Sequence, residues 1–275
     1  DRLSFIQWFV KENSEVSSLF NSDVSPEKIA DQTSGLSIHA IRQLLLSKDL
    51  SSENINDKVE QYMIGQLGEG VVEFQRTSHK LDSVIGFRKV KKKKKNELIP
   101  DFINGSIGGV AVAGPIGGGK TFICEAVASE VGVPVIVLKS IRSKWFGETD
   151  QIFERLRRLL ETFFKIVVFV DEADTQFGNV QDDSGGGTEK RLTGKIQSMM
   201  SDVRLKGRII WFLMTARIQL LSPDIRRPGR MDLIIPILDP EDKDDISDFI
   251  KWTFSSLKIE GIEINSDIRE IVKGY

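Results

Sequence analysis

The segment from Gly114 to Thr121 constrains this chain more than any other, because it follows the pattern G-x-x-x-x-G-K-T. An apolar run, Val110–Ala113, precedes it, and a helix-like stretch, Phe122–Val131, follows it. Such a strand, loop and helix lets several backbone N–H groups converge on a phosphate, and the helix N-terminus adds positive potential. Lys120 would reach the β- and γ-phosphate oxygens while the Thr121 hydroxyl binds Mg²⁺. An ordinary glycine turn would not need lysine and threonine here, so the sequence predicts a phosphate-binding loop.

A second motif begins with the apolar run Ile166–Val170, which has the length expected for a strand buried on both faces of a parallel sheet. The run ends in an acidic stretch from Asp171 to Asp174. In open α/β sheets, ligands bind beyond the carboxyl ends of the strands. Asp171 is therefore placed to hold Mg²⁺ through water, and Glu172 to polarise a water molecule for attack on a γ-phosphate. A solvated acidic turn is the alternative, but the phosphate-binding loop favours the nucleotide site.

From about Leu81 to Tyr275, the order of these motifs resembles the AAA family of P-loop ATPases, within the wider AAA+ group. The resemblance implies an α/β P-loop NTPase fold: a five-stranded parallel sheet flanked by helices, with an N-terminal helical segment and the start of a C-terminal helical lid. The alternation of apolar runs with helical patterns agrees with such a sheet. The expected strands lie near Gly109–Ala113, Val135–Leu138, Ile166–Val170, Ile209–Met214 and Leu233–Ile237.

The resemblance also implies that the chain binds ATP with Mg²⁺. The segment Leu81–Phe87 is similar to the one that packs around adenine in the family, although Ile85 replaces the first glycine of its usual pair. Thr121 and Asp171 are the expected metal ligands, and Glu172 is an expected catalytic residue. The expected nucleotide-binding residues are Ser83, Val84, Ile85, Gly114, Pro115, Ile116, Gly117, Gly118, Gly119, Lys120, Thr121 and Asp171.

Two other segments resemble family motifs for assembly and substrate handling. The segment with Arg227 and Arg230 resembles the arginine-finger motif, whose guanidinium groups act in catalysis by reaching the γ-phosphate held by a neighbouring subunit. A planar, permanently charged fork suits that role better than lysine. Trp145 and Phe146 resemble the first pore loop, which grips an extended polypeptide inside a ring. Burial under the following helix is the alternative for these two aromatic side chains.

One position departs from the family pattern. The strand before the arginine fingers usually ends in Thr-Asn, and the asparagine helps to orient the attacking water. Unchanged spacing back from Arg230 places Thr215 and Ala216 there. The methyl side chain of Ala216 forms no hydrogen bond. We therefore expect an ATPase with slowed hydrolysis.

The composition fits a globular chain with at least one full α/β domain. The 275 residues are 40% hydrophobic and 28% charged, and the net charge of −2 argues against a bulk basic surface for nucleic acid. Cys124 is the single cysteine, so no internal disulfide forms and a cytoplasmic location is expected. No apolar run in this sequence approaches the roughly 20 residues that span a bilayer, and no signal peptide is visible.

Residues 1 to about 64 show mainly helical patterns, with Ser25 and Ser37 as expected N-caps and Pro26 at a first helical position. The run Ile29–Leu36 resembles the helical lid that follows an AAA ATPase domain, so another ATPase-like domain is expected upstream. We expect four regions: a lid-like helical domain (1–64), a linker and entry helix (65–105), the large α/β domain (106–240) and the start of a C-terminal lid (241–275).

Several segments carry weaker signals. The run Lys91–Lys95 is interpreted as the solvated face of the entry helix, with contact to nucleic acid or an acidic partner as the alternative. His39 and His79 lack metal-ligand spacing and are interpreted as ordinary surface or lid residues. The stretch from 178 to 187 is either a linker or a second pore loop, and Arg191 on the next helix is expected to face a subunit interface.

Together these features predict an ATPase that assembles into a homo-oligomeric ring, with a hexamer as one option, and remodels or translocates a protein substrate. The first alternative is a regulatory scaffold that binds ATP with little hydrolysis, which Ala216 favours. The second is a nucleic-acid remodelling ATPase, which only the lysine run supports. The absence of aromatic side chains among those lysines disfavours the second alternative.

Overall fold

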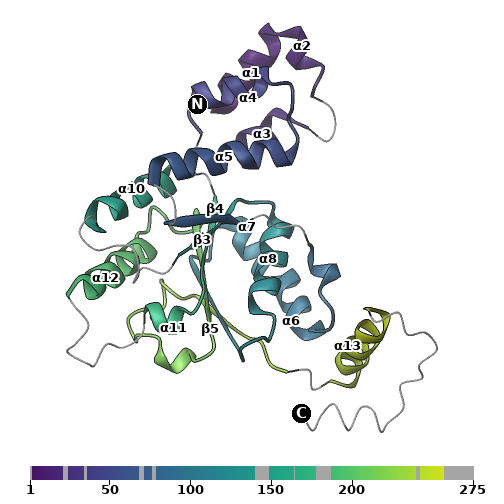
Figure 1. The fold of residues 1–275 in the computed structure, drawn as a ribbon, viewed down its shortest axis with the longest axis vertical. Coiled ribbons are helices and arrows are strands. Elements are labelled where there is room, and N and C mark those ends of the chain that lie inside the picture. Colours follow the sequence, from purple (N-terminus) through teal and green to yellow (C-terminus); the bar gives the residue numbers. More distant parts are fainter. Residues whose placement is uncertain are drawn as a thin grey trace.

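The computed structural model of the chain describes residues 2–20, 24–33, 36–67, 71–75, 79–139, 149–163, 165–177, 187–239 and 242–256. Helices cover both faces of a central β-sheet, with further helices at the N-terminal end (Figure 1). The strands are β1 (Val72–Gln75), β2 (Gly109–Ala113), β3 (Val135–Leu138), β4 (Ile166–Val170), β5 (Ile209–Thr215) and β6 (Leu233–Pro236).

The sheet has the order β1-β3-β4-β5-β2-β6 among the described residues. All five strands predicted from the sequence are present and parallel, which confirms the α/β P-loop class. The sixth strand, β1, pairs antiparallel with β3 at the edge, and the five-strand prediction did not include it in the sheet. Parallel strands are joined by helical crossovers, whereas β1 is an antiparallel edge strand. The alternation of strands and helices therefore could not predict the place of β1 in the sheet.

The central strands bury side chains on both faces, since every residue of β4 and β5 is buried. Successive side chains on a strand point to opposite faces. Val168 and Trp211 therefore join one apolar cluster with Leu156 and Ile196, whereas Phe169 and Phe212 join a second. In Figure 1, α10 (Thr149–Thr162), α11 (Ala173–Gln176) and α12 (Gly187–Ser201) cover the first face, and α6 (Arg88–Lys93), α7 (Ile99–Asn104) and α8 (Lys120–Val131) cover the second.

The N-terminal helices are α1 (Arg2–Glu12), α2 (Ser14–Ser17), α3 (Pro26–Gln32), α4 (Ile38–Leu46) and α5 (Ser52–Leu67). The predicted caps are present, because Ser37 accepts a hydrogen bond from the Ala40 N–H at 3.2 Å and Ser25 accepts one from the Lys28 N–H at 3.2 Å. Helix α5 contacts α10 and β1, and Arg2 donates to the Thr162 carbonyl at 2.6 Å. The N-terminal helices thus share one apolar cluster with the sheet.

Three short helical segments and one longer helix complete the described chain: η1 (Leu81–Ser83), η2 (Lys94–Leu98), η3 (Ile218–Leu220) and α13 (Lys243–Ser256). The predicted entry helix is present as α6, the π-helical η2 and α7. The side chain of Lys91 does not lie on a solvated face, because its Nζ donates to the Val84 carbonyl at 2.6 Å. Lys92 is exposed, as predicted for this run.

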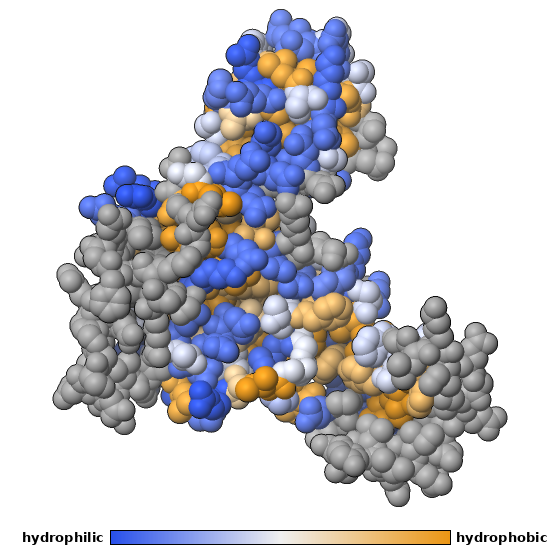
Figure 2. Space-filling view, viewed as in Figure 1, coloured by the Kyte–Doolittle hydropathy of each residue, from blue (hydrophilic) through white to orange (hydrophobic). Residues whose placement is uncertain are grey.

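On the face drawn in Figure 2, the coloured surface is mostly hydrophilic and carries several apolar patches. Within the described residues, no helix is both long enough and apolar enough to cross a membrane.

Candidate nucleotide-binding site

The predicted phosphate-binding loop connects the end of β2 to the first residue of α8. Gly117 and Gly119 have φ angles of +79° and +77°, a backbone conformation that residues with a side chain rarely adopt. A Cβ on Gly114 would lie 2.2 Å from the Ile237 carbonyl oxygen, so the start of the loop also needs glycine. The loop leads into the N-terminal turn of α8, whose first N–H groups have no partner within the helix. These groups and the positive end of the helix suit an anion.

The two polar residues at the start of α8 lie against a cavity of about 950 Å³. The Nζ of Lys120 donates to the Gly114 carbonyl at 3.0 Å and to the Pro115 carbonyl at 2.8 Å, so its ammonium group lies over the loop. Thr121 is exposed and lines the same cavity. Ile116, at the tip of the loop, is 91% exposed. The loop therefore presents a cation and a hydroxyl group to the cavity.

The acidic pair enters this cavity from the carboxyl end of β4, as predicted. Asp171 accepts a hydrogen bond from the Glu172 N–H at 2.8 Å, and its backbone carbonyl accepts one from the Gln176 side chain at 2.9 Å. Glu172 has a φ of +47°, which is uncommon for a residue with a side chain. Such strained residues gather at functional sites, and Glu172 lies at the turn between β4 and α11.

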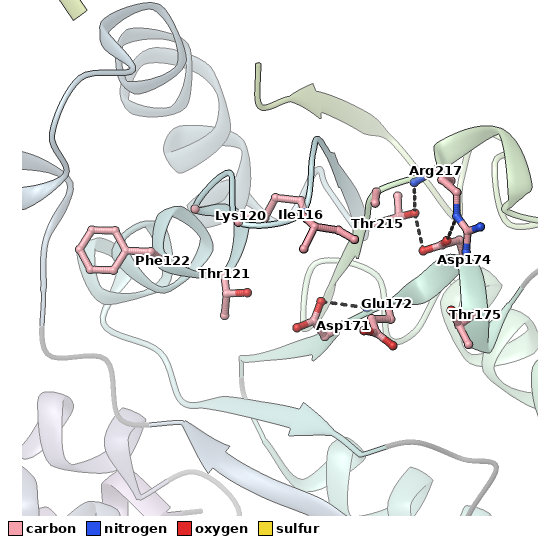
Figure 3. A pocket seen from close by; sticks show the side chains of 13 residues that line it. Ile116, Lys120, Thr121, Phe122, Asp171, Glu172, Asp174, Thr175, Thr215 and Arg217 are labelled. Atoms are coloured by element: carbon pink, nitrogen blue, oxygen red, sulfur yellow. Dashed lines mark hydrogen bonds and ion pairs between the residues drawn. The ribbon is translucent and has the colours of Figure 1, made fainter. Parts of the chain in front are cut away.

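The motif spacing placed Thr215 at the end of its strand but did not predict that it forms a third group in the cavity with Asp174 and Arg217. Asp174, Thr215 and Arg217 line it together with the phosphate-binding loop and the acidic pair. Figure 3 shows these three side chains on one side of the cavity and Lys120, Thr121 and Phe122 on the other. Strands β4 and β5 are neighbours in the sheet, which brings α11 beside the end of β5. A sequence signal for this group was available, because adjacent parallel strands have their carboxyl ends at the same edge of the sheet, where ligands bind.

Ala216 follows the last residue of β5 and lines the cavity, at the place that the motif spacing predicted. The residue is exposed, and its methyl side chain supplies no hydrogen-bond donor or acceptor. A polar contact from this side of the cavity must therefore come from its neighbours.

A second cavity, of about 440 Å³, adjoins the first at the phosphate-binding loop. Ser83, Val84 and Ile85, the segment expected to bind the base, line it. Four aromatic residues also line this cavity: Phe87, Phe122, Phe249 and Trp252. Because the loop glycines and Phe122 line both cavities, the polar and the aromatic spaces lie side by side along the loop.

Helix α13 brings Phe249 and Trp252 to the aromatic cavity, and acidic residues of its first turns fix its position. Arg88 forms ion pairs with Asp244 at 3.1 Å and with Asp248 at 2.7 Å. Gly86 has a φ of +64°, and a Cβ there would lie 2.5 Å from the Phe249 ring. The absence of a side chain at this glycine thus permits the close approach of α13.

His79 is not an ordinary surface residue, contrary to the prediction. Its ring stacks on Phe122 with centroids 3.8 Å apart, and its Nε2 lies 2.8 Å from the Phe122 carbonyl oxygen. Glu125 lies 3.8 Å away, and burial raises the pKa of its carboxyl group. The stack holds Phe122, which is 44% exposed, where the two cavities meet. His39 is exposed on α4, as predicted.

The two predicted arginine fingers do not line the cavity that contains Lys120 of their own chain. Arg227 is 70% exposed and pairs with Asp224 at 3.1 Å. Arg230 donates to the Ser201 hydroxyl at 2.5 Å and to the Asp224 carbonyl at 3.0 Å. Their segment therefore lies at the end of α12.

The pore-loop prediction for Trp145 and Phe146, and most of the 178–187 stretch, lie outside the described residues. Arg191 lies on α12, but its side chain is not among those described. The segment after residue 256 is also outside the described chain.

Sequence models of known families match two parts of the chain. Residues 110–238 match the family of ATPases associated with various cellular activities (AAA). Residues 1–58 match the second helical domain of AAA+ chaperones. The first match contains the phosphate-binding loop, the acidic pair and both arginines, and the second covers most of the predicted lid-like segment.

Curated relatives are similar to about half of the chain. Protein SAV of Sulfolobus acidocaldarius is 33% identical over 137 residues, which are 49% of this chain and 17% of that protein. The cell division cycle protein 48 homolog of Archaeoglobus fulgidus is 34% identical over 138 residues, or 48% of this chain and 18% of that protein. The ATPase family gene 2 protein of Saccharomyces cerevisiae is 28% identical, over 58% of this chain and 20% of that protein. The matched part thus spans about a fifth of each relative.

A solved structure supports the fold. The crystal structure of the FIGL-1 AAA domain in complex with ADP superposes with a TM-score of 0.58 and 22% identity, and the match covers 78% of this chain and 74% of that one. Both helical and α/β parts of the sequence interpretation therefore have counterparts in known proteins. Residues 110–238 belong to the AAA family of ATPases, and they follow a helical domain of the AAA+ chaperone type at residues 1–58.

Proposed function

We propose that the chain binds ATP with Mg²⁺ and hydrolyses it. The observation that carries this proposal is the meeting of the glycine loop, Lys120, Thr121 and the acidic pair in one cavity. Lys120 would exchange its two backbone carbonyl partners for phosphate oxygens, which form stronger, charge-assisted hydrogen bonds. The hydroxyl group of Thr121 and the carboxylate of Asp171 supply the oxygen ligands that Mg²⁺ prefers.

Bound Mg²⁺ would neutralise charge on the phosphates, and Glu172 would accept a proton from the attacking water. The residue suits that role because its carboxylate lines the cavity directly after Asp171 in the chain. The base would lie in the aromatic cavity, against Val84 and Ile85. The relative crystallised with ADP supports a nucleotide in such a fold.

The assembly and substrate proposals extend beyond the described chain. We propose a homo-oligomeric ring, with a hexamer as one option, in which Arg227 and Arg230 reach the neighbour's site. A protein substrate would be gripped by Trp145 and Phe146. The match of residues 1–58 to a chaperone domain supports protein remodelling over nucleic-acid remodelling. The four regions 1–64, 65–105, 106–240 and 241–275 remain our proposed division, and a cytoplasmic location fits the single, buried Cys124.

A second candidate function is an ATP-binding scaffold with little turnover. Ala216 favours it, because this residue cannot orient a water molecule through its side chain. The two functions share the binding step and differ in hydrolysis, so a binding assay tests both and a turnover assay separates them.

The binding step is tested by Lys120→Ala. We expect ATP affinity to fall at least about tenfold, because the phosphates lose their main cationic partner. The measurement is isothermal titration with Mg²⁺, and Lys92→Ala serves as a control that removes an exposed lysine away from the cavity. Unchanged ATP affinity in the Lys120 variant, with wild-type folding, would show that the loop is not the phosphate site.

A further inference from the structure

Asp174, Thr215 and Arg217, to which the sequence motifs assign no ligand, form a connected group at the edge of the cavity. The Thr215 hydroxyl donates to Asp174 Oδ1 at 2.7 Å and accepts from the Arg217 N–H at 3.0 Å. Arg217 Nε donates to Asp174 Oδ2 at 2.9 Å. Both carboxylate oxygens of Asp174 thus accept a hydrogen bond, one from Thr215 at the end of β5 and one from the Arg217 side chain (Figure 3).

Burial and charge differ sharply within this group. The Asp174 side chain is only 5% exposed, so its negative charge needs partners, and Thr215 and Arg217 provide them. The Arg217 side chain is 59% exposed and lines the cavity. Its Nη1 and Nη2 atoms make no hydrogen bond or ion pair with the described part of the chain. The guanidinium group is therefore fixed through Nε while two N–H-bearing atoms stay available to a ligand.

The position of this guanidinium group indicates which part of a nucleotide it meets. Figure 3 shows Lys120 and Thr121 on the opposite side of the cavity, with Asp171 and Glu172 between the two sides. The loop N–H groups would hold the inner phosphates and Lys120 would reach the β- and γ-phosphates, so the outermost phosphate would lie between Lys120 and the side of the cavity that carries Glu172 and Arg217. Ala216, the residue between Thr215 and Arg217, offers that phosphate no polar atom.

We propose that Arg217 binds the γ-phosphate of the nucleotide in its own chain and that Asp174 and Thr215 are positioning residues for it. This inference rests on the proposed nucleotide site and deepens it. A planar guanidinium suits the task, because it donates two parallel hydrogen bonds to phosphate oxygens. The contact stabilises the triphosphate and not the diphosphate, so the chain distinguishes the two nucleotides even though Ala216 cannot.

The test compares the affinities of a non-hydrolysable ATP analogue, AMP-PNP, and of ADP, both with Mg²⁺, by isothermal titration. We expect Arg217→Ala to weaken AMP-PNP binding about tenfold or more and to change ADP binding by less than about twofold. Arg217→Lys, which keeps the charge but not the fork, should recover part of the loss. Arg204→Ala is the matched control, because Arg204 is also an exposed arginine in an ion pair and lies outside the cavity.

The positioning role is tested with Asp174→Asn, which keeps the shape and removes the charge that orients Arg217. The ratio of AMP-PNP to ADP affinity should fall in this variant while Arg217 is still present, and thermal melting checks that the variant folds. Equal weakening of both nucleotides in Arg217→Ala, or no change in either, would overturn the inference. If Lys120→Ala also leaves both affinities unchanged, the nucleotide site itself is wrong. If it weakens both, only the role of Arg217 fails.

Discussion

Glu172 combines two properties at one residue: a carboxylate in the proposed nucleotide cavity and a left-handed backbone conformation. We expect Glu172→Gln to keep ATP bound and to abolish residual hydrolysis, because the amide preserves shape but cannot accept the proton. Binding is measured by titration and turnover by phosphate release at saturating ATP. Glu125→Gln is a control, since Glu125 lies on α8 beside His79 and not in this cavity. If turnover persists in the Glu172→Gln variant, Glu172 does not accept the proton in hydrolysis.

At the scale of elements, the segment that carries the arginines is held to the start of β2 by one carboxylate. Asp232 accepts hydrogen bonds from the Gly108 N–H at 2.7 Å, from Lys206 at 3.2 Å and from the Gly229 N–H at 3.2 Å. Asp232→Asn should lower the free energy of unfolding by about 1–3 kcal/mol, because an amide cannot accept all three bonds and places a donor against another donor. Denaturant unfolding measures the change. Asp224→Asn, at an exposed ion pair in the same segment, should cost less than about 1 kcal/mol.

The same carboxylate predicts a pH dependence. Burial would raise the pKa of Asp232, but the hydrogen bonds from Gly108 and Lys206 outweigh it, and the pKa lies below its ordinary value of 3.8. Since the folded pKa is lowered, the stabilisation is complete above the unfolded pKa and is lost as pH falls through the folded pKa. The stability difference between wild type and Asp232→Asn should therefore be constant near pH 7 and shrink below about pH 4. A difference that grows toward acid would contradict this account.

At the scale of the whole molecule, the residues proposed for catalysis lie in two places. Lys120 and Glu172 share a cavity, whereas Arg227 and Arg230 lie by the end of α12 and do not line it. If the arginines act on a neighbouring subunit, mixing Arg230→Ala subunits with Lys120→Ala subunits should restore part of the ATPase activity. At some mixed interfaces, a subunit with Lys120 intact would then face a neighbour with Arg230 intact. In other systems such arginines contribute about a thousandfold or more in rate.

The complementation is measured as ATP turnover of mixtures against each variant alone, with oligomer formation followed by light scattering. A mixture of Lys120→Ala with Glu172→Gln subunits is the control, because both changes damage the same half of the site. If the Arg230 mixture is no more active than its components while the oligomer is intact, the site is not shared.

Local sequence determined much of this protein. The glycines, Lys120 and Thr121 specify a phosphate-binding loop because its geometry depends on φ angles and N–H groups within eight consecutive residues. The five parallel strands were equally predictable, because each is an apolar run with its own turn signals. The positions of Ser83, Val84 and Ile85 in the second cavity followed from their resemblance to a known segment.

Tertiary structure decided what distant residues do together. Asp174 and Arg217 are 43 residues apart, and they meet only because β4 and β5 are neighbours in the sheet. His79 stacks on Phe122 across a comparable separation, and α13 reaches the aromatic cavity through the ion pairs of Arg88. No periodicity or spacing encodes such pairs, because burial and pairing act between elements whose order in space differs from their order in sequence. The sequence alone therefore determined the loop and the acidic pair, and the fold added the arginine that faces them.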